Sequence, residues 1–220
     1  MLSRRFTDRT VRIAAASLAT LAMAGCATPS FLEGVIEPQP APVDSGAMSP
    51  AARDVPPQVL TMFEQATAAM AAGDFVDAEL RFQEFVLQYP DYPGAWVNLA
   101  IIRAQAGNDD GAREALDVAL ALNPNHPAAL NQLGMLHRRN GDFLEAEAAY
   151  LKAVTVSPDY ALAHYNLGVL NDLYLQRFET ALQHFETYQS LVGEDQQVEK
   201  WIIDLRRRVE AAQRAANVAE

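Results

Sequence analysis

The sequence predicts an all-α protein, a solenoid of about four helix-turn-helix units closed by one further helix at the C-terminus. The first observation is a fixed period: a shift of thirty-four residues aligns Gly73 with Gly107 and Gly141, and a repeat of this length is typical of stacked units. The second observation is that each of the first three units closes on a proline, whereas Gly193 stands at that place in the fourth. These prolines are Pro90, Pro124 and Pro158. Because proline stops a helix, the pattern indicates pairs of helices separated by turns.

The first twenty-six residues predict a secretory signal peptide. Four arginines precede an apolar run over 13–23, and the small residues Ala24 and Gly25 lead into Cys26. A basic head, a short apolar middle and a small-residue exit are typical of an export signal, and the run is too short to span a bilayer as a helix. The chain is therefore expected to be exported.

The end of this signal predicts a lipid anchor. Residues 21–26 read Leu-Ala-Met-Ala-Gly-Cys, which resembles the lipobox of bacterial lipoproteins, with Met23 where leucine is usual. The resemblance implies cleavage before Cys26 and acylation of its thiol, and several acyl chains anchor a protein stably. Ala27, which is not aspartate, implies an outer-membrane lipoprotein facing the periplasm if the source is Gram-negative. A plain signal peptide with an incidental cysteine is the alternative.

Charge and cysteine content exclude several classes of function. The chain has 17 basic and 28 acidic residues and a formal net charge of −11. Cleavage would remove four arginines and Asp8, which leaves 13 basic and 27 acidic residues and a net charge of −14. A phosphate backbone attracts the opposite sign, so no nucleic-acid partner is expected. A single cysteine excludes a disulfide framework and a cysteine-rich zinc site.

Residues 27–56 predict a disordered, proline-rich tether. They carry six prolines and no sustained hydrophobic period, so they lack the pattern of a packed element. Such a segment spans about 30 Å as a random coil and at most roughly 90 Å when fully extended. The expected result is a folded domain that stands off the membrane.

Turn residues and small residues predict a pair of helices within each unit. Each repeated glycine is expected to end the first helix in a left-handed conformation, and Asp74, Asn108 or Asp142 to cap the second helix. Small residues recur where the paired helices cross, so their backbones can approach closely. These positions are Ala66, Ala100, Gly134 and Gly168 on the first helices, and Ala78, Ala112, Ala146 and Ala181 on the second helices.

This arrangement resembles the tetratricopeptide repeat family. Residues 96–99 (Trp-Val-Asn-Leu) and 131–134 (Asn-Gln-Leu-Gly) carry its first-helix signature, and the resemblance implies a right-handed superhelical solenoid. The repeats are predicted at 59–92, 93–126, 127–160 and 161–195. Gln65 replaces the usual leucine of the first repeat, and the fourth repeat has one extra residue in its turn, at 175–178.

Residues 196–220 predict a C-terminal capping helix. Apolar residues recur at helical spacing, and the last unit of a solenoid needs a cover. A helix that binds a partner is the alternative. The apolar stripe consists of Val198, Trp201, Ile202, Leu205 and Val209.

No motif of catalysis accompanies the repeats. The four histidines lack the spacing of metal ligands, and the chain has no phosphate loop and no nucleophile elbow. We therefore expect neither an enzyme nor a bound cofactor or metal, and no small-molecule substrate. Stacked repeats offer a concave surface instead, so the function is expected to lie in binding a partner.

The resemblance places the binding surface at defined positions of the first helices. Asn98, Gln132 and Asn166 form a row of carboxamides one repeat apart, and amides both donate and accept hydrogen bonds, as the backbone of an extended peptide requires. The expected contact residues are Phe63, Val97, Asn98, Ile101, Gln105, Asn131, Gln132, Met135, Arg138, Arg139, Tyr165, Asn166, Val169 and Asp172.

The signal and the repeats together predict a membrane-anchored scaffold or adaptor of the bacterial envelope. The combination resembles the pilotins of type IV pili, the Flp-pilus assembly lipoproteins and the lipoprotein adaptors of peptidoglycan hydrolases. The resemblance implies a protein or extended-peptide partner in a pilus, secretion or cell-wall complex. A periplasmic chaperone-like holder of unfolded outer-membrane proteins is the alternative, and an enzyme is the third possibility.

Overall fold

The computed structural model describes residues 55–219 of the chain. The predicted signal peptide, the lipidation of Cys26 and nearly all of the tether over 27–56 lie outside these residues. Those three expectations therefore stay predictions.

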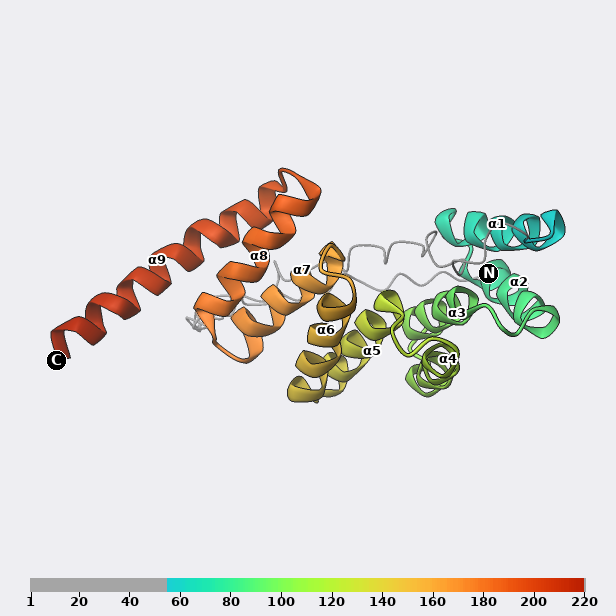
Figure 1. Cartoon of the computed structure of the whole chain (residues 1–220), viewed down its shortest axis with the longest axis horizontal. Coiled ribbons are helices and arrows are strands. Elements are labelled where there is room, and N and C mark those ends of the chain that lie inside the picture. The colour runs from blue at the N-terminus through green and yellow to red at the C-terminus, as the bar shows by residue number, and fades with distance from the viewer. Residues whose placement is uncertain (1–54, 220) are drawn as a thin grey trace, which may run out of the picture. The chain divides into compact units, whose positions relative to one another are not determined.

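Residues 55–219 form helices connected by short turns and contain no strand. Within this part of the chain, none of the helices has both the length and the apolar character of a membrane span. Figure 1 shows the helices following one another along the chain. Their bounds are α1 Pro57–Ala71, α2 Phe75–Gln88, α3 Pro93–Gln105, α4 Asp109–Leu122, α5 Pro127–Asn140, α6 Phe143–Val156, α7 Ala161–Val169, the π-helical turn η2 Leu170–Tyr174, α8 Phe178–Val192 and α9 Gln196–Ala219.

The helices pair as the sequence predicts. Helices α1 and α2, α3 and α4, α5 and α6, and α7 and α8 pack as antiparallel hairpins, and each hairpin packs on the next through the second helix of one and the first helix of the other. In addition, α3 packs against α5, and α5 packs against α7. The first helices of the second, third and fourth units therefore lie side by side, and the all-α solenoid is confirmed.

The turns within the hairpins follow the predicted chemistry with one exception. The three repeated glycines have φ values of 78°, 76° and 87°, the left-handed conformation that glycine adopts without strain. Asp74 and Asn108 accept hydrogen bonds from backbone N–H groups three residues later, at 3.1 and 2.9 Å. The expectation that Asp142 caps α6 is wrong: its side chain makes no capping bond, and its Oδ2 lies 3.5 Å from Nδ1 of His137 instead.

The paired helices cross at small residues, as predicted. All eight positions are buried, and at the two glycines large rings of the second helices lie against them. A Cβ atom added at Gly134 would lie 2.5 Å from Cε1 of Tyr150, and one added at Gly168 would lie 2.6 Å from Cδ1 of Phe185. At these two crossings only glycine fits without displacing a ring.

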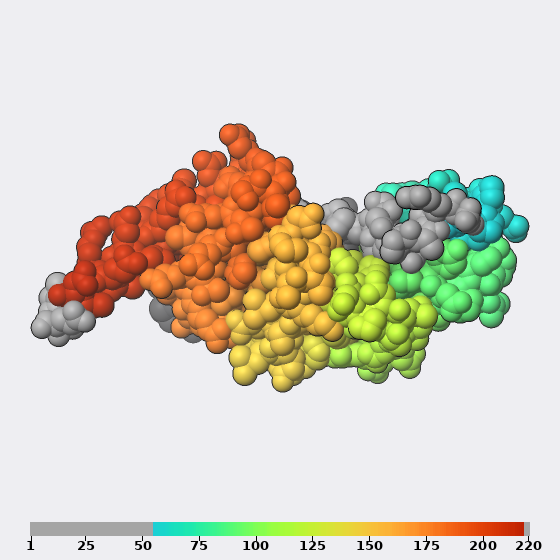
Figure 2. All heavy atoms as spheres, in the orientation of Figure 1, coloured from blue at the N-terminus to red at the C-terminus, as the bar shows by residue number. Residues whose placement is uncertain are grey.

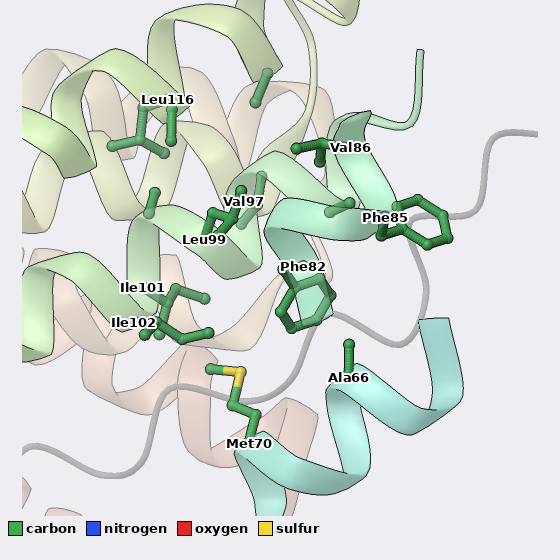
Figure 3. Close-up of a cluster of buried hydrophobic side chains, with 14 of the residues drawn as sticks. Ala66, Met70, Phe82, Phe85, Val86, Val97, Leu99, Ile101, Ile102 and Leu116 are labelled. Carbon is green, nitrogen blue, oxygen red and sulfur yellow. The ribbon is translucent and has the colours of Figure 1, made fainter. Parts of the chain in front are cut away.

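Aromatic rings fill the first hairpin. Phe82 of α2 lies above Ala66 of α1 in Figure 3, and its ring centroid is 5.6 Å from that of Phe63 in an edge-to-face arrangement. Phe85 makes a similar contact with Phe63 at 5.5 Å. Such pairs stabilise a core beyond the area that they bury.

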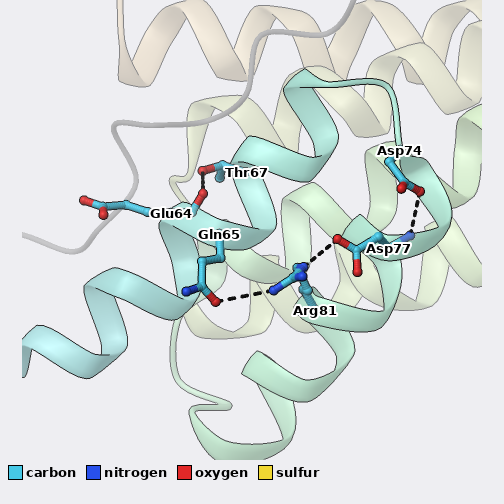
Figure 4. A network of polar contacts seen from close by, with 6 residues as sticks. All are labelled: Glu64, Gln65, Thr67, Asp74, Asp77 and Arg81. Atoms are coloured by element: carbon cyan, nitrogen blue, oxygen red, sulfur yellow. Dashed lines mark hydrogen bonds and ion pairs between the residues drawn. The ribbon is translucent and has the colours of Figure 1, made fainter.

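The first unit tolerates a polar residue where leucine is usual because that residue faces solvent. Gln65 is exposed, and its Oε1 accepts a hydrogen bond of 3.3 Å from Arg81 of α2. Arg81 in turn pairs with Asp77 at 2.6 Å. Figure 4 shows this chain of contacts, which joins the two helices at the surface.

The extra residue of the fourth unit is absorbed by a π-helical turn. The N–H of Leu175 donates to the carbonyl of Leu170 over five residues, at 3.0 Å, and Gln176 has a φ of 55°. The side chain of Asn171 donates to the carbonyl of Leu167 at 2.9 Å. The wider turn lets α8 begin one residue late and still pack on α7.

Helix α9 covers α8 with the apolar stripe that the sequence predicts. Val198, Ile202 and Leu205 are buried, and arginines reinforce the contact. Arg206 pairs with Glu186 of α8 at 2.7 Å. Arg208 pairs with Asp172 of η2 at 2.7 Å. From residue 210 to 217 the side chains are exposed, and Figure 2 shows the last turns of α9 uncovered by the other helices.

Candidate functional site

The candidate site is the inner face, defined here as the surface that α3, α5 and α7 share. Ten residues carry the sharpest prediction for this face. Three of them are half-buried: Met135, Arg138 and Tyr165. The other seven are buried, namely Val97, Asn98, Ile101, Asn131, Gln132, Asn166 and Val169. The structure therefore brings the predicted residues together but gives them different exposures.

Two members of the predicted carboxamide row, Asn166 and Asn98, differ in their hydrogen bonds. Asn166 of α7 donates from Nδ2 to Oδ1 of Asn131 on α5 at 2.9 Å, so its amide joins two first helices. Asn131 donates in turn to the sulfur of Met135 at 3.8 Å. Asn98 is fully buried, and neither its Nδ2 nor its Oδ1 has a hydrogen-bond partner. An unsatisfied buried amide costs about 1–3 kcal/mol, so Asn98 is the member with unused hydrogen-bonding capacity.

Tyr165 lies in an aromatic cluster that the sequence analysis did not predict. Its ring centroid lies 6.1 Å from that of Phe185, 5.3 Å from Tyr188 and 6.0 Å from Trp201. Burial raises the pKa of Tyr165, and the neighbouring Tyr188 adds to the rise. Trp201 belongs to the apolar stripe of α9, so this stripe was the available signal that α9 reaches the inner face. The cluster closes the C-terminal end of that face.

Arg138 lacks an acidic partner among residues 55–219. Seven of the ten arginines there form ion pairs, and the three that do not are Arg113, Arg138 and Arg207. Arg138 is the one of these three on the inner face. Its charge lowers the pKa of Tyr150 and of Tyr165, against the larger effect of burial, which raises both. The inner face thus carries a cation close to two tyrosine rings.

Four further residues were expected on the inner face, and three of them serve the fold. Arg139 donates to the carbonyl of Ala104 at 2.7 Å and pairs with Asp109 at 3.1 Å, so it braces α5 against the second unit. Asp172 holds Arg208 of α9. Phe63 is buried in the first hairpin. The fourth residue, Gln105, is exposed at the end of α3.

No group of three or more histidine, cysteine, aspartate or glutamate residues within 55–219 is arranged to hold a metal ion. The inner face instead offers half-buried methionine and tyrosine side chains, a cation and a buried amide. This combination is suited to contact with a polypeptide, because it supplies apolar area together with hydrogen bonds and one charge.

Comparison with known sequence families identifies the repeats. Profiles of the tetratricopeptide repeat match residues 63–127, 115–148 and 134–171. A human protein described as protein O-mannosyl-transferase TMTC2 is 41% identical over 66 residues, which are 30% of this chain and 8% of that protein. The chain thus spans less than a tenth of the length of this relative.

Two solved structures share the fold. The structure titled functional characterisation of Pseudomonas aeruginosa pilF has a TM-score of 0.63 and 20% identity, over 70% of this chain and 69% of that one. MamA from Desulfovibrio magneticus RS-1 has a TM-score of 0.57 and 19% identity, over 74% of this chain and 92% of that one. The chain contains tetratricopeptide repeats stacked as in these structures, a fold that is typical of protein–protein interaction scaffolds.

Proposed function

We propose that this chain of tetratricopeptide repeats is a lipid-anchored adaptor of the bacterial envelope that holds a segment of a partner protein on its inner face. The repeats provide the scaffold, and the N-terminal sequence supports the anchor. A basic head, a short apolar run and a lipobox-like ending at Cys26 favour export and acylation. The proline-rich residues 27–56 then give the repeats a reach of about 30 Å from the membrane.

The observation that carries the binding proposal is Arg138. The chain has a net charge of −11, yet Arg138 has no acidic partner among residues 55–219 and lies half-buried on the first helix α5. Met135 lies one turn before it on α5, and Tyr165 lies on the neighbouring helix α7. A segment that places a carboxylate on Arg138 and apolar side chains on Met135 and Tyr165 complements this arrangement.

Asn98 supports an extended conformation for the bound segment. Its buried amide has an unused donor and an unused acceptor, the pair of groups that one backbone unit of a peptide satisfies. Because a small opening between α3 and α5 would bring a peptide backbone to this amide, binding would recover the free energy that Asn98 costs when it is unsatisfied. The partner of the proposal is therefore an extended, acidic and partly apolar segment.

A charge reversal tests the binding proposal. The mature chain, carrying Arg138→Glu or the control Arg207→Glu, is used to capture partners from envelope extract after chemical cross-linking. Arg207 is exposed on α9 and also lacks an acidic partner, so it controls for the change in net charge. Loss of one dominant partner with Arg138→Glu alone supports the proposal. Equal capture by both variants contradicts it, and many weak partners would favour the chaperone-like holder.

The anchor is tested separately. Globomycin, which blocks the lipoprotein signal peptidase, is expected to make the uncleaved precursor accumulate, and Cys26→Ser is expected to release the chain from the membrane fraction. Fractionation of the outer membrane then tests the location. Normal processing in the presence of globomycin would contradict the proposed lipidation and leave the binding proposal untouched.

A further inference from the structure

Two histidines of the fourth unit face each other outside the inner-face site. His164 lies on α7 and His184 on α8. Their Nδ1 atoms are 3.1 Å apart, and their ring centroids are 5.3 Å apart at an interplanar angle of 44°. His164 is buried and His184 is half-buried, so solvent reaches the pair from the side of His184. The proposed adaptor function uses neither ring.

The tautomer of His164 follows from its other nitrogen. Nε2 lies 3.1 Å from the carbonyl oxygen of Pro158, and since a carbonyl only accepts, Nε2 carries the proton. Trp96 makes the same contact two units earlier, where its indole N–H donates to the carbonyl of Pro90 at 2.8 Å. An indole nitrogen is always a donor, which supports the same assignment for His164. Nδ1 of His164 therefore presents a lone pair to His184.

The residues at the place of His184 in other units show that the fold does not require a histidine pair. His184 lies three residues after Ala181, and the corresponding residues after Ala112 and Ala146 are Ala115 and Ala149. In the second unit, Trp96 and Ala115 thus occupy the places that two imidazoles take in the fourth. Apolar residues serve the same packing elsewhere in this chain, so the fourth unit carries two nitrogen ligands at a place where none is needed.

We propose that His164 and His184 bind a divalent transition-metal cation through their two Nδ1 atoms, with Zn²⁺ as the reference ion. Zinc binds imidazole nitrogen at about 2.0–2.1 Å, so two ligands of a tetrahedral ion lie roughly 3.3–3.4 Å apart. The observed separation of 3.1 Å needs only a small opening. The bond from His164 to the carbonyl of Pro158 is the outer contact that orients a metal-binding histidine.

The proton balance of binding is simple. Without metal, His184 donates its Nδ1 proton to Nδ1 of His164. On binding, that proton moves to Nε2 of His184 through solvent, both rings stay neutral, and both Nδ1 lone pairs turn to the metal. Water completes the coordination, because the described residues contribute no third ligand.

Calorimetry of the full mature chain without a histidine tag tests this proposal. Zn²⁺ is titrated at pH 7.5 into the unaltered chain, into His184→Ala and into the control His137→Gln. Alanine stands at the corresponding position of two other units, so His184→Ala is expected to fold, and His184→Gln with a circular dichroism spectrum is the second variant. We expect one site, retained in the control and weakened at least about tenfold in both His184 variants.

A spectroscopic readout identifies the ligands. Nitrogen NMR of the imidazoles is expected to show the Nδ1 resonances of His164 and His184, and not those of His137, shifting on addition of Zn²⁺. Bound Zn²⁺ should also raise the melting temperature, because it joins α7 to α8 only in the folded state. Absence of binding at 0.1 mM Zn²⁺, or unchanged binding in His184→Ala, would overturn the proposal.

Discussion

The close approach of α5 and α6 at Gly134 makes a strong prediction about stability. Substitution of Gly134 by alanine adds a methyl group whose carbon would lie 2.5 Å from Cε1 and 2.6 Å from Cδ1 of Tyr150. Tyr150 is fully buried, so its ring cannot swing into solvent. The two helices must separate, or the ring must leave its preferred position.

The change in stability caused by Gly134→Ala follows from two opposing effects. Alanine is favoured over glycine within a helix by about 1 kcal/mol, whereas overpacking a well-filled core costs about 1–3 kcal/mol. Because the contact is with a rigid ring, we expect the upper part of the second range and a net loss of about 1–2 kcal/mol. For a chain of this length, this loss lowers the melting temperature by roughly 2–8 °C.

Urea unfolding followed by circular dichroism measures the effect. The control is the same substitution in a Tyr150→Leu background, where the ring is gone and the helix preference of alanine remains. There Gly134→Ala is expected to stabilise by up to about 1 kcal/mol, so the sign reverses and the two positions show coupling. If Gly134→Ala stabilises the chain with Tyr150 present, the reasoning about this crossing is wrong.

Three further predictions concern single groups. Tyr150→Phe is expected to be neutral or slightly stabilising in urea unfolding, because the hydroxyl of Tyr150 is buried without a hydrogen-bond partner; a loss of 2 kcal/mol or more, about the cost of breaking a buried bond, would show a missed partner. Burial and His164 lower the pKa of His184 from 6.5 to about 4. Neutral His184 therefore makes its full contribution to the free energy of unfolding above pH 6.5, and this contribution is lost as the pH falls toward 4. The loss at pH 5 is about 1 kcal/mol after allowance for solvent screening, and unfolding curves of His184→Ala should lack it. Arg208→Ala removes the ion pair to Asp172 and the contact of the guanidinium with the ring of Phe178 at 3.8 Å; hydrogen exchange of α9 should become faster while that of α3 stays unchanged.

The sequence predicted the repeats well because local rules determine them. Glycines at one fixed spacing place the turns, and small residues at two fixed places set the crossings, so pattern alone predicts the hairpins. The C-terminal helix α9 was also predictable, since the apolar stripe from Val198 to Leu205 indicates which side of this helix is covered. These signals depend on neighbours in sequence or on one repeating contact.

The roles of polar side chains were less predictable because they depend on neighbours distant in sequence. Asp142 has the right position to cap α6, yet its carboxylate lies beside His137. Arg139 and Asp172 occupy inner-face positions by their place in the repeat, yet each is held by a partner distant in sequence: Arg139 by the carbonyl of Ala104 and Asp172 by Arg208. The facing rings of His164 and His184 had no sequence signal, because a separation of twenty residues matches no ligand spacing.

The central claim is that the inner face holds a partner in the envelope, and site-specific photo-cross-linking in living cells tests it most directly. A photoreactive amino acid replaces Met135 on the inner face or, as the control, Leu151, which is 43% exposed on α6. The proposed function predicts one dominant cross-linked product from position 135 and none from position 151. Cross-linking from position 151 alone, or from neither position, would contradict it.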